Sequence, residues 1–173
     1  MFTKADIEKY FVAEKQESLI FMAIGIAGII LAIVFFFFPK TNFYKGASIP
    51  LLAVGLLLGI VGYTVYNRSD SDRTRNVYAY DMNPSQLQNE ELPRMKIVMK
   101  NFVIYRYTEI ALALTGIFLF IYFRSSESHL FWKGFGLTLT IMALLALSAD
   151  YFAEQRGKIY LNGLTKHLNE KMK

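Results

Sequence analysis

Three ionisable residues near the ends of apolar segments are the best candidates for chemistry in this chain: Arg106, Glu109 and Asp150. Arg106 and Glu109 are three residues apart, which places them on one helix face, where opposite charges can pair. Asp150 lies at the end of the last apolar segment, and Arg106 is its candidate partner inside a helix bundle. An ion or proton pathway would need charge near the membrane midplane, where this chain has none. We therefore expect Asp150 to hold one end of a bundle together.

Motifs for catalysis or cofactor binding are missing from the sequence. The absence of cysteine excludes disulfides, thiolate metal sites and thiol redox chemistry. The two histidines, His129 and His167, fall on opposite sides of the membrane in the topology derived below, so one chain cannot use both on a single metal. The chain has no P-loop, H-E-x-x-H or G-x-S-x-G pattern. We expect a protein that is not an enzyme and that has neither a cofactor nor a metal.

The apolar segments that must position the candidate residues are long enough to cross a membrane. Hydrophobic residues make up 54% of the 173 residues, and the first apolar run is 21 residues long without a charge. About 18 or more such residues are typical of a transmembrane helix, so a soluble single-core domain is excluded. The third span reaches this length only if it begins at Phe102, with Arg106 and Glu109 at the membrane edge. The four expected spans are 18–38, 49–66, 102–123 and 132–151.

Basic residues are distributed very unevenly around these spans. Fifteen of the 19 lysines and arginines fall before the first span, after the fourth, or between the second and third, when Arg106 at the edge of the third span is included. The positive-inside rule then places both termini and the long loop in the cytoplasm, as in a multi-pass protein of the bacterial inner membrane. The expected organisation is a cytoplasmic amphipathic lead-in, a first transmembrane hairpin, a cytoplasmic loop with an amphipathic helix, a second hairpin and a cytoplasmic tail, at 1–17, 18–66, 67–101, 102–151 and 152–173.

The sequence matches itself when it is shifted by 88 residues. In this register Phe43-Tyr44-Lys45-Gly46 aligns with Phe131-Trp132-Lys133-Gly134, and Tyr63 aligns with Tyr151. Upstream, a shift of 91 aligns Phe11 with Phe102 and Lys15 with Arg106. Both units begin on the same side of the membrane, so they would be parallel repeats related by an axis along the membrane normal. The alternative is convergent chemistry at membrane edges. The expected fold is an all-α integral membrane protein with four transmembrane helices in two tandem parallel-repeat hairpins, plus cytoplasmic interfacial helices.

Small residues recur on the second span of each hairpin. Such residues let helix backbones approach closely in a membrane, where lipid provides no hydrophobic drive for association. The pattern fits contact within one four-helix bundle better than a dimer face, although it serves both. The residues concerned are Gly55, Gly59 and Gly62 in the second span, and Ala143, Ala146 and Asp150 in the fourth.

Amphipathic stretches lie outside the spans at 4–15 and 161–172, where apolar residues recur at helical spacing among lysines. They are interpreted either as interfacial helices on anionic lipid headgroups or as helices that pack on the long loop. In that loop, residues 69–72 predict a polar turn, and Asn83-Pro84 predicts a helix start. A second helix is expected to begin near 90–93. The basic residues here are mixed with acids and form no nucleic-acid module, so lipid is the expected partner and nucleic acid is not.

These observations favour a small non-catalytic inner-membrane protein that binds another membrane protein. Its role would be that of an accessory subunit or of an immunity-type protein that neutralises a membrane-acting toxin; self-association is also compatible with the helix faces. The alternative is an oligomeric small transporter or channel subunit, although the hydroxyl side chains at membrane depth are better explained as helix–helix hydrogen-bonding groups. A lipid-modifying enzyme that uses Asp150, Glu109 and Arg106 is the least favoured hypothesis. The hydroxyl residues are Thr115, Thr138, Thr140 and Ser148.

Overall fold

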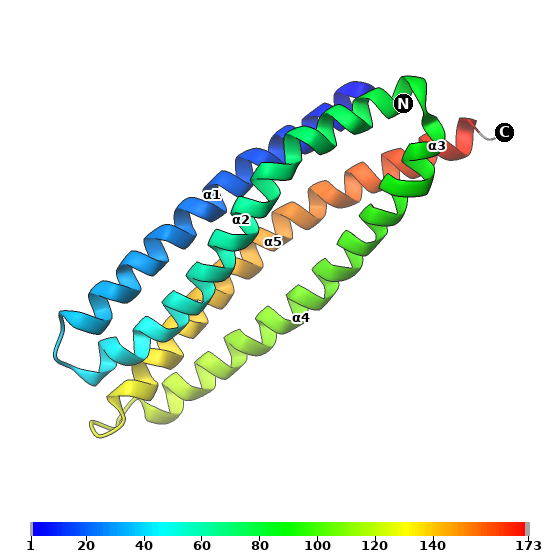
Figure 1. The fold of residues 1–173 in the computed structure, drawn as a ribbon. Helices are drawn as coiled ribbons and strands as arrows, with labels where there is room; N and C mark the ends of the chain where they lie inside the picture. Colours follow the sequence, from blue (N-terminus) through cyan, green and yellow to red (C-terminus); the bar gives the residue numbers. More distant parts are fainter. Residues whose placement is uncertain (1, 172–173) are drawn as a thin grey trace.

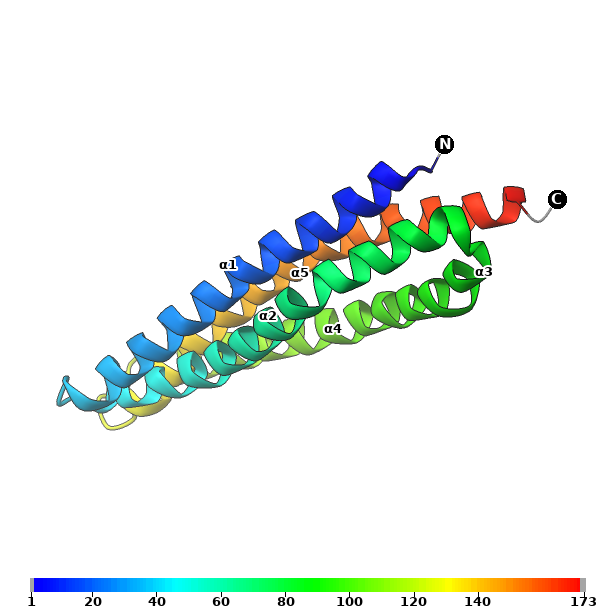
Figure 2. The ribbon, with the colours of Figure 1, turned by 45° about the horizontal axis from the view of Figure 1, so that its top comes forward.

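The computed structural model describes residues 2–171 as an elongated bundle of helices (Figure 1). The two termini lie at one end, called the terminal end below, and the two short turns after the first and third long helices lie at the other, called the turn end (Figures 1 and 2). The elements are α1 (Lys4–Phe37), α2 (Asn42–Met82), α3 (Pro84–Gln86), the π-helical turn η1 (Leu87–Glu91), α4 (Leu92–Phe123) and α5 (Leu130–Lys171).

Within the described residues, four helices are long and apolar enough to cross a membrane, which indicates a multi-pass membrane protein. The most apolar 18-residue window of each helix is only 11–28% buried inside the bundle. An apolar helix face that is exposed in this way is unfavourable in water but stable against lipid tails. The backbone polar groups do not oppose this placement, because they are hydrogen-bonded within each helix. The prediction of four spanning helices is therefore confirmed at the level of helix number, length and apolarity.

The bundle is built from two helical hairpins. Helix α1 packs along α2, which forms hairpin 1, and α4 packs along α5, which forms hairpin 2. The hairpins meet mainly through α2 and α5, while α1 approaches α5 more briefly. In the spanning region, α1 and α4 therefore have one main neighbour each and present most of their surface to the outside.

As far as the structure describes them, the amphipathic stretches continue the long helices beyond the apolar region and pack against one another at the terminal end; Met172 of the second stretch lies outside the described residues. Of the two arrangements considered from the sequence, the structure has packing on the long loop rather than free interfacial helices. Four apolar faces brought side by side bury one another, which removes more apolar surface than separate contacts with headgroups. This terminal core consists of Ile7, Tyr10, Phe11, Ala79, Leu87, Met95, Tyr160, Leu164 and Leu168.

The polar turn predicted at 69–72 is wrong, because these residues lie inside α2. The hydroxyl of Ser69 donates to the carbonyl of Val65 at 2.7 Å, and the serine is buried against α1. Asp70 pairs with Lys15 of α1, and Asp72 pairs with Arg75 one turn further along α2. Ion pairs and a back-bonded hydroxyl thus keep a polar sequence helical.

The predicted helix starts in the same region are found. Asn83 precedes Pro84, which is the first residue of α3. Helix α4 begins at Leu92, within the range expected for the second helix. Between them, η1 turns the chain so that Leu87 and Glu91 are buried at the terminal core.

Candidate functional site

The glycines of α2 are used for contact within hairpin 1. A Cβ atom on Gly25 would lie 2.6 Å from the carbonyl oxygen of Gly55 and 2.6 Å from the amide nitrogen of Gly59. A Cβ atom on Gly62 would lie 2.7 Å from the carbonyl oxygen of Ser18. These backbone contacts are the intramolecular use of the small-residue pattern that the sequence favours. Gly59 itself has open space where its Cβ atom would be.

The small residues of α5 have a looser environment. Ala143 is buried, whereas Ala146 is half-buried. The close approach of α5 to hairpin 1 occurs instead near the turn end, at Gly134. A Cβ atom there would overlap the carbonyl of Phe43, and a Cβ atom on Gly46 would overlap the carbonyl of Phe131. The two contacts exchange the positions that the 88-residue shift aligns, which is the pattern of a local twofold interface.

Arg106 does not pair with Asp150 or Glu109, so the predicted partners are wrong. Its guanidinium donates to both carboxylate oxygens of Glu154 on α5, each at 2.5 Å. Lys158 also pairs with Glu154 at 2.7 Å, and the Glu154 side chain is only 5% exposed. The hydrogen bond from Lys158 and, to a smaller extent, the one from Arg106 hold the pKa of Glu154 below its ordinary value, against the opposing effect of burial. Glu154 was missed because it lies beyond the predicted end of the fourth span.

Glu109 and Asp150 lie across the α4–α5 contact from each other. Their carboxyl groups are close enough to interact directly. None of the ion pairs in the described part of the chain includes either residue. Oε2 of Glu109 is shielded from solvent and has no hydrogen-bond partner among the described residues. Hairpin 2 therefore holds two neighbouring carboxyl groups without a cation of their own.

A groove of about 430 Å³ runs between α4 and α5 beside this carboxyl pair. Its volume lies within the range of roughly 300–1,000 Å³ that is usual for ligand pockets. Most of its wall is apolar or aromatic, and Phe152 and Tyr151 on its rim are exposed, so it opens sideways at the edge of the apolar region. It is lined by Phe102, Arg106 and Ile110 of α4, and by Leu147, Ser148, Asp150, Tyr151, Phe152 and Glu154 of α5.

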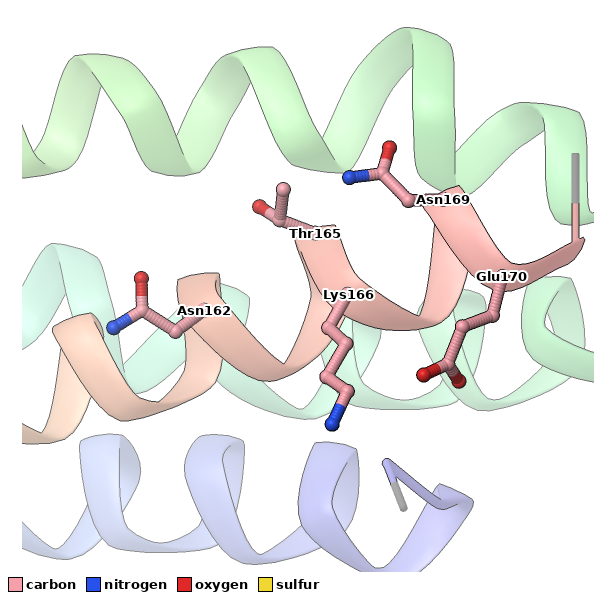
Figure 3. A pocket seen from close by; sticks show the side chains of 5 residues that line it. All are labelled: Asn162, Thr165, Lys166, Asn169 and Glu170. Atoms are coloured by element: carbon pink, nitrogen blue, oxygen red, sulfur yellow. The ribbon is translucent and has the colours of Figure 1, made fainter.

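A second hollow of about 330 Å³ lies near the terminal end (Figure 3). All of its lining residues belong to α5, and Figure 3 shows Lys166 pointing away from Thr165 and Asn169. Because one helix supplies every side chain, this hollow is an open stretch of helix surface. It contains none of the candidate residues.

A buried polar network at the terminal core was not foreseen from the sequence. Glu91, which η1 delivers to the core, accepts two hydrogen bonds from Arg94, at 2.7 and 2.8 Å. The rings of Tyr10 and Tyr160 stack at 4.2 Å beside this pair, and burial raises the pKa of both phenols. Burial also raises the pKa of Glu14, against the lowering effect of Arg68. Nothing in local spacing identifies this network, because its members come from five elements.

The hydroxyl groups at membrane depth bond within their own helices. Thr115, Thr140 and Ser148 each donate to the carbonyl four residues earlier, at 2.8–2.9 Å. The expectation of helix–helix hydrogen bonds is thus wrong for these three. An intrahelical carbonyl is always within reach of such a side chain, whereas a neighbouring helix is not.

The histidines lie at opposite ends of the bundle, as the topology requires. His129 is in the turn between α4 and α5, and His167 stacks on Tyr80 at 4.7 Å in the terminal core. Residues 2–171 contain no group of three metal-ligating side chains that could hold an ion.

No known family model, curated protein or solved structure matches this chain.

Proposed function

We propose that this chain is a non-catalytic protein of the bacterial inner membrane, with both termini in the cytoplasm, that binds another membrane protein laterally. An accessory subunit or an immunity-type protein that neutralises a membrane-inserted toxin has this requirement. Anionic headgroups are the proposed lipid contacts of the basic terminal end. The observation that carries the proposal is the exposure of α4, whose apolar window is only 11% buried, the least of the four helices. Its outer face is the proposed partner surface.

We also propose that the two hairpins are duplicated copies of one ancestral hairpin. The reciprocal contacts of Gly46 with Phe131 and of Gly134 with Phe43 support this, because two copies related by a twofold axis would make the same contact twice. After duplication, one copy can keep the packing role while the other acquires a binding role. The groove and the carboxyl pair occur in hairpin 2, which makes it the proposed binding copy.

Site-specific photocrosslinking in native membranes tests the partner surface. A photoreactive residue at Ile121 of α4 is compared with one at Ile30 of α1. These positions are 91 residues apart, so they correspond in the two hairpins, and they are equally exposed at 57% and 56%. We expect one discrete adduct with a second membrane protein from Ile121 and none from Ile30.

Equal adducts from both positions would contradict a partner surface on α4. Adducts that contain only a second copy of this chain would replace the proposed partner with self-association. Ile121 and Ile30 are far from the groove in sequence and contribute nothing to its lining, so the result does not depend on what the groove binds.

A further inference from the structure

We propose that the groove between α4 and α5 binds a hydrophobic primary amine, with its ammonium group at Asp150 and its hydrocarbon part along Ile110, Leu147 and Phe152. This is a small-molecule site in addition to the proposed partner surface on α4. The two proposals rest on different residues and can fail separately.

The side chains around the groove carry an excess of negative charge, which a bound cation would balance. Arg106 and Lys158 are both engaged by Glu154. Asp150, which lines the groove, and Glu109, which lies beside it, have no such partner among the described residues. Acidic groups therefore outnumber basic ones here, and two carboxylates at the edge of an apolar region are stabilised by a positive charge between them.

The shape of the groove selects an organic cation over a metal ion. A hard metal ion prefers six or more oxygen ligands at short distances, and the described residues contain no group of three suitable side chains. A primary ammonium needs only three acceptors. The carboxylate of Asp150 and the hydroxyl oxygen of Ser148, which lines the same groove and donates its own proton to Leu144, are acceptors of this kind. The apolar wall then accommodates the alkyl part.

Hairpin 1 provides an internal reference for the site. The shifts of 91 and 88 residues align Glu109 with Ser18 and Asp150 with Gly62. In hairpin 1 this place is closed, because Gly62 packs directly on the main chain of Ser18. The same helix pair can thus be joined there without carboxyl groups and without a groove. The acids of hairpin 2 are therefore additions to the packing scheme, which is the expectation for a binding site.

Isothermal titration of the full chain in a nonionic detergent tests the site, with decylammonium as the probe. Decanol and decyl sulfate serve as the neutral and anionic comparisons, and detergent alone is the blank. We expect saturable binding of one decylammonium per chain and no saturable binding of the other two. In the Glu109→Gln/Asp150→Asn double variant, affinity should fall at least about tenfold, as expected when charge-assisted hydrogen bonds are lost.

The control is the Asp81→Asn/Glu90→Gln double variant, which removes the same charge at exposed positions outside the groove. It should bind decylammonium as the parent protein does. Equal binding of decanol, unchanged affinity in the groove variant, saturable binding of magnesium in place of the amine, or no saturable binding at all would each overturn the proposal. Circular dichroism of each variant establishes that the titrated protein is folded.

Discussion

At corresponding positions, hairpin 1 brings Gly62 against the main chain of Ser18, whereas hairpin 2 places Asp150 beside Glu109. The first arrangement joins two helices by close backbone contact. The second leaves a groove of about 430 Å³ and a pair of carboxyl groups. At these positions hairpin 1 is thus joined by main-chain contact, whereas hairpin 2 carries two acidic side chains for which we propose a role in binding.

The two hairpins share a contact between a cation on the first helix and a side chain on the second. Lys15 of α1 lies 4.6 Å from the ring of Tyr66 and pairs with Asp70 on α2. Arg106 corresponds to Lys15, and it pairs with Glu154, which corresponds to Tyr66. In both hairpins a cation on the first helix thus binds the second helix just beyond the apolar region. This contact is part of the common architecture, and the carboxyl pair is not.

The largest expected effect tests the symmetry of the two hairpins at their shared interface. Gly46→Ala would force a Cβ atom into the carbonyl of Phe131, and Gly134→Ala would do the same at Phe43. Because main chain cannot yield as a flexible side chain does, each variant should lose about 3 kcal/mol of unfolding free energy. Denaturant titration in detergent measures both. Losses of unfolding free energy that differ severalfold between the two variants would show that the two glycines do not make equivalent contacts.

A smaller effect distinguishes the two faces of the glycine pattern in hairpin 1. Gly25→Ala places a Cβ atom 2.6 Å from backbone atoms of Gly55 and Gly59, so it should cost about 2 kcal/mol. Gly59→Ala meets open space and should be neutral or gain up to about 1 kcal/mol from helix propensity. The same titration checks both variants. Equal destabilisation by the two would show that hairpin 1 is not held by this contact.

The smallest effect concerns the shared ion pair in hairpin 2. Glu154→Gln should cost about 1–2 kcal/mol, since Arg106 and Lys158 are partly exposed and screened. The pKa of Glu154 is below its ordinary value of 4.5, so its carboxylate stabilises the fold fully above that pH. This contribution disappears as the pH falls through the lowered pKa. Unfolding measured from pH 7 to pH 3 should therefore show a steeper loss in the parent than in the variant, and parallel curves would contradict this role.

Some features of this fold could be predicted from the sequence because they depend on local pattern. The uncharged run at 18–38 is sufficient to predict a spanning helix, and Asn83 followed by Pro84 is sufficient to predict a helix start. The small residues at Gly55 and Gly62 correctly indicated close helix contact. Each of these features is fixed within one or two turns of helix.

Other features depend on how far helices continue and on how they are aligned with one another. Glu154 became the partner of Arg106 because α5 runs past the apolar region without a break, which span length alone does not reveal. The proximity of Glu109 to Asp150 depends on the axial register of α4 against α5. The self-match aligns the two acids with Ser18 and Gly62, which are in contact in hairpin 1. It predicts that Glu109 and Asp150 are neighbours only once that contact in hairpin 1 is known.

The most direct test of the claim that the carboxyl pair of hairpin 2 serves binding and not packing is to measure stability and amine affinity together in Glu109→Gln/Asp150→Asn. The account predicts an unfolding free energy equal to that of the parent and an affinity for decylammonium at least about tenfold lower. A lower unfolding free energy with unchanged affinity in the remaining folded protein would contradict it. In that case the two acids would belong to the architecture of the bundle.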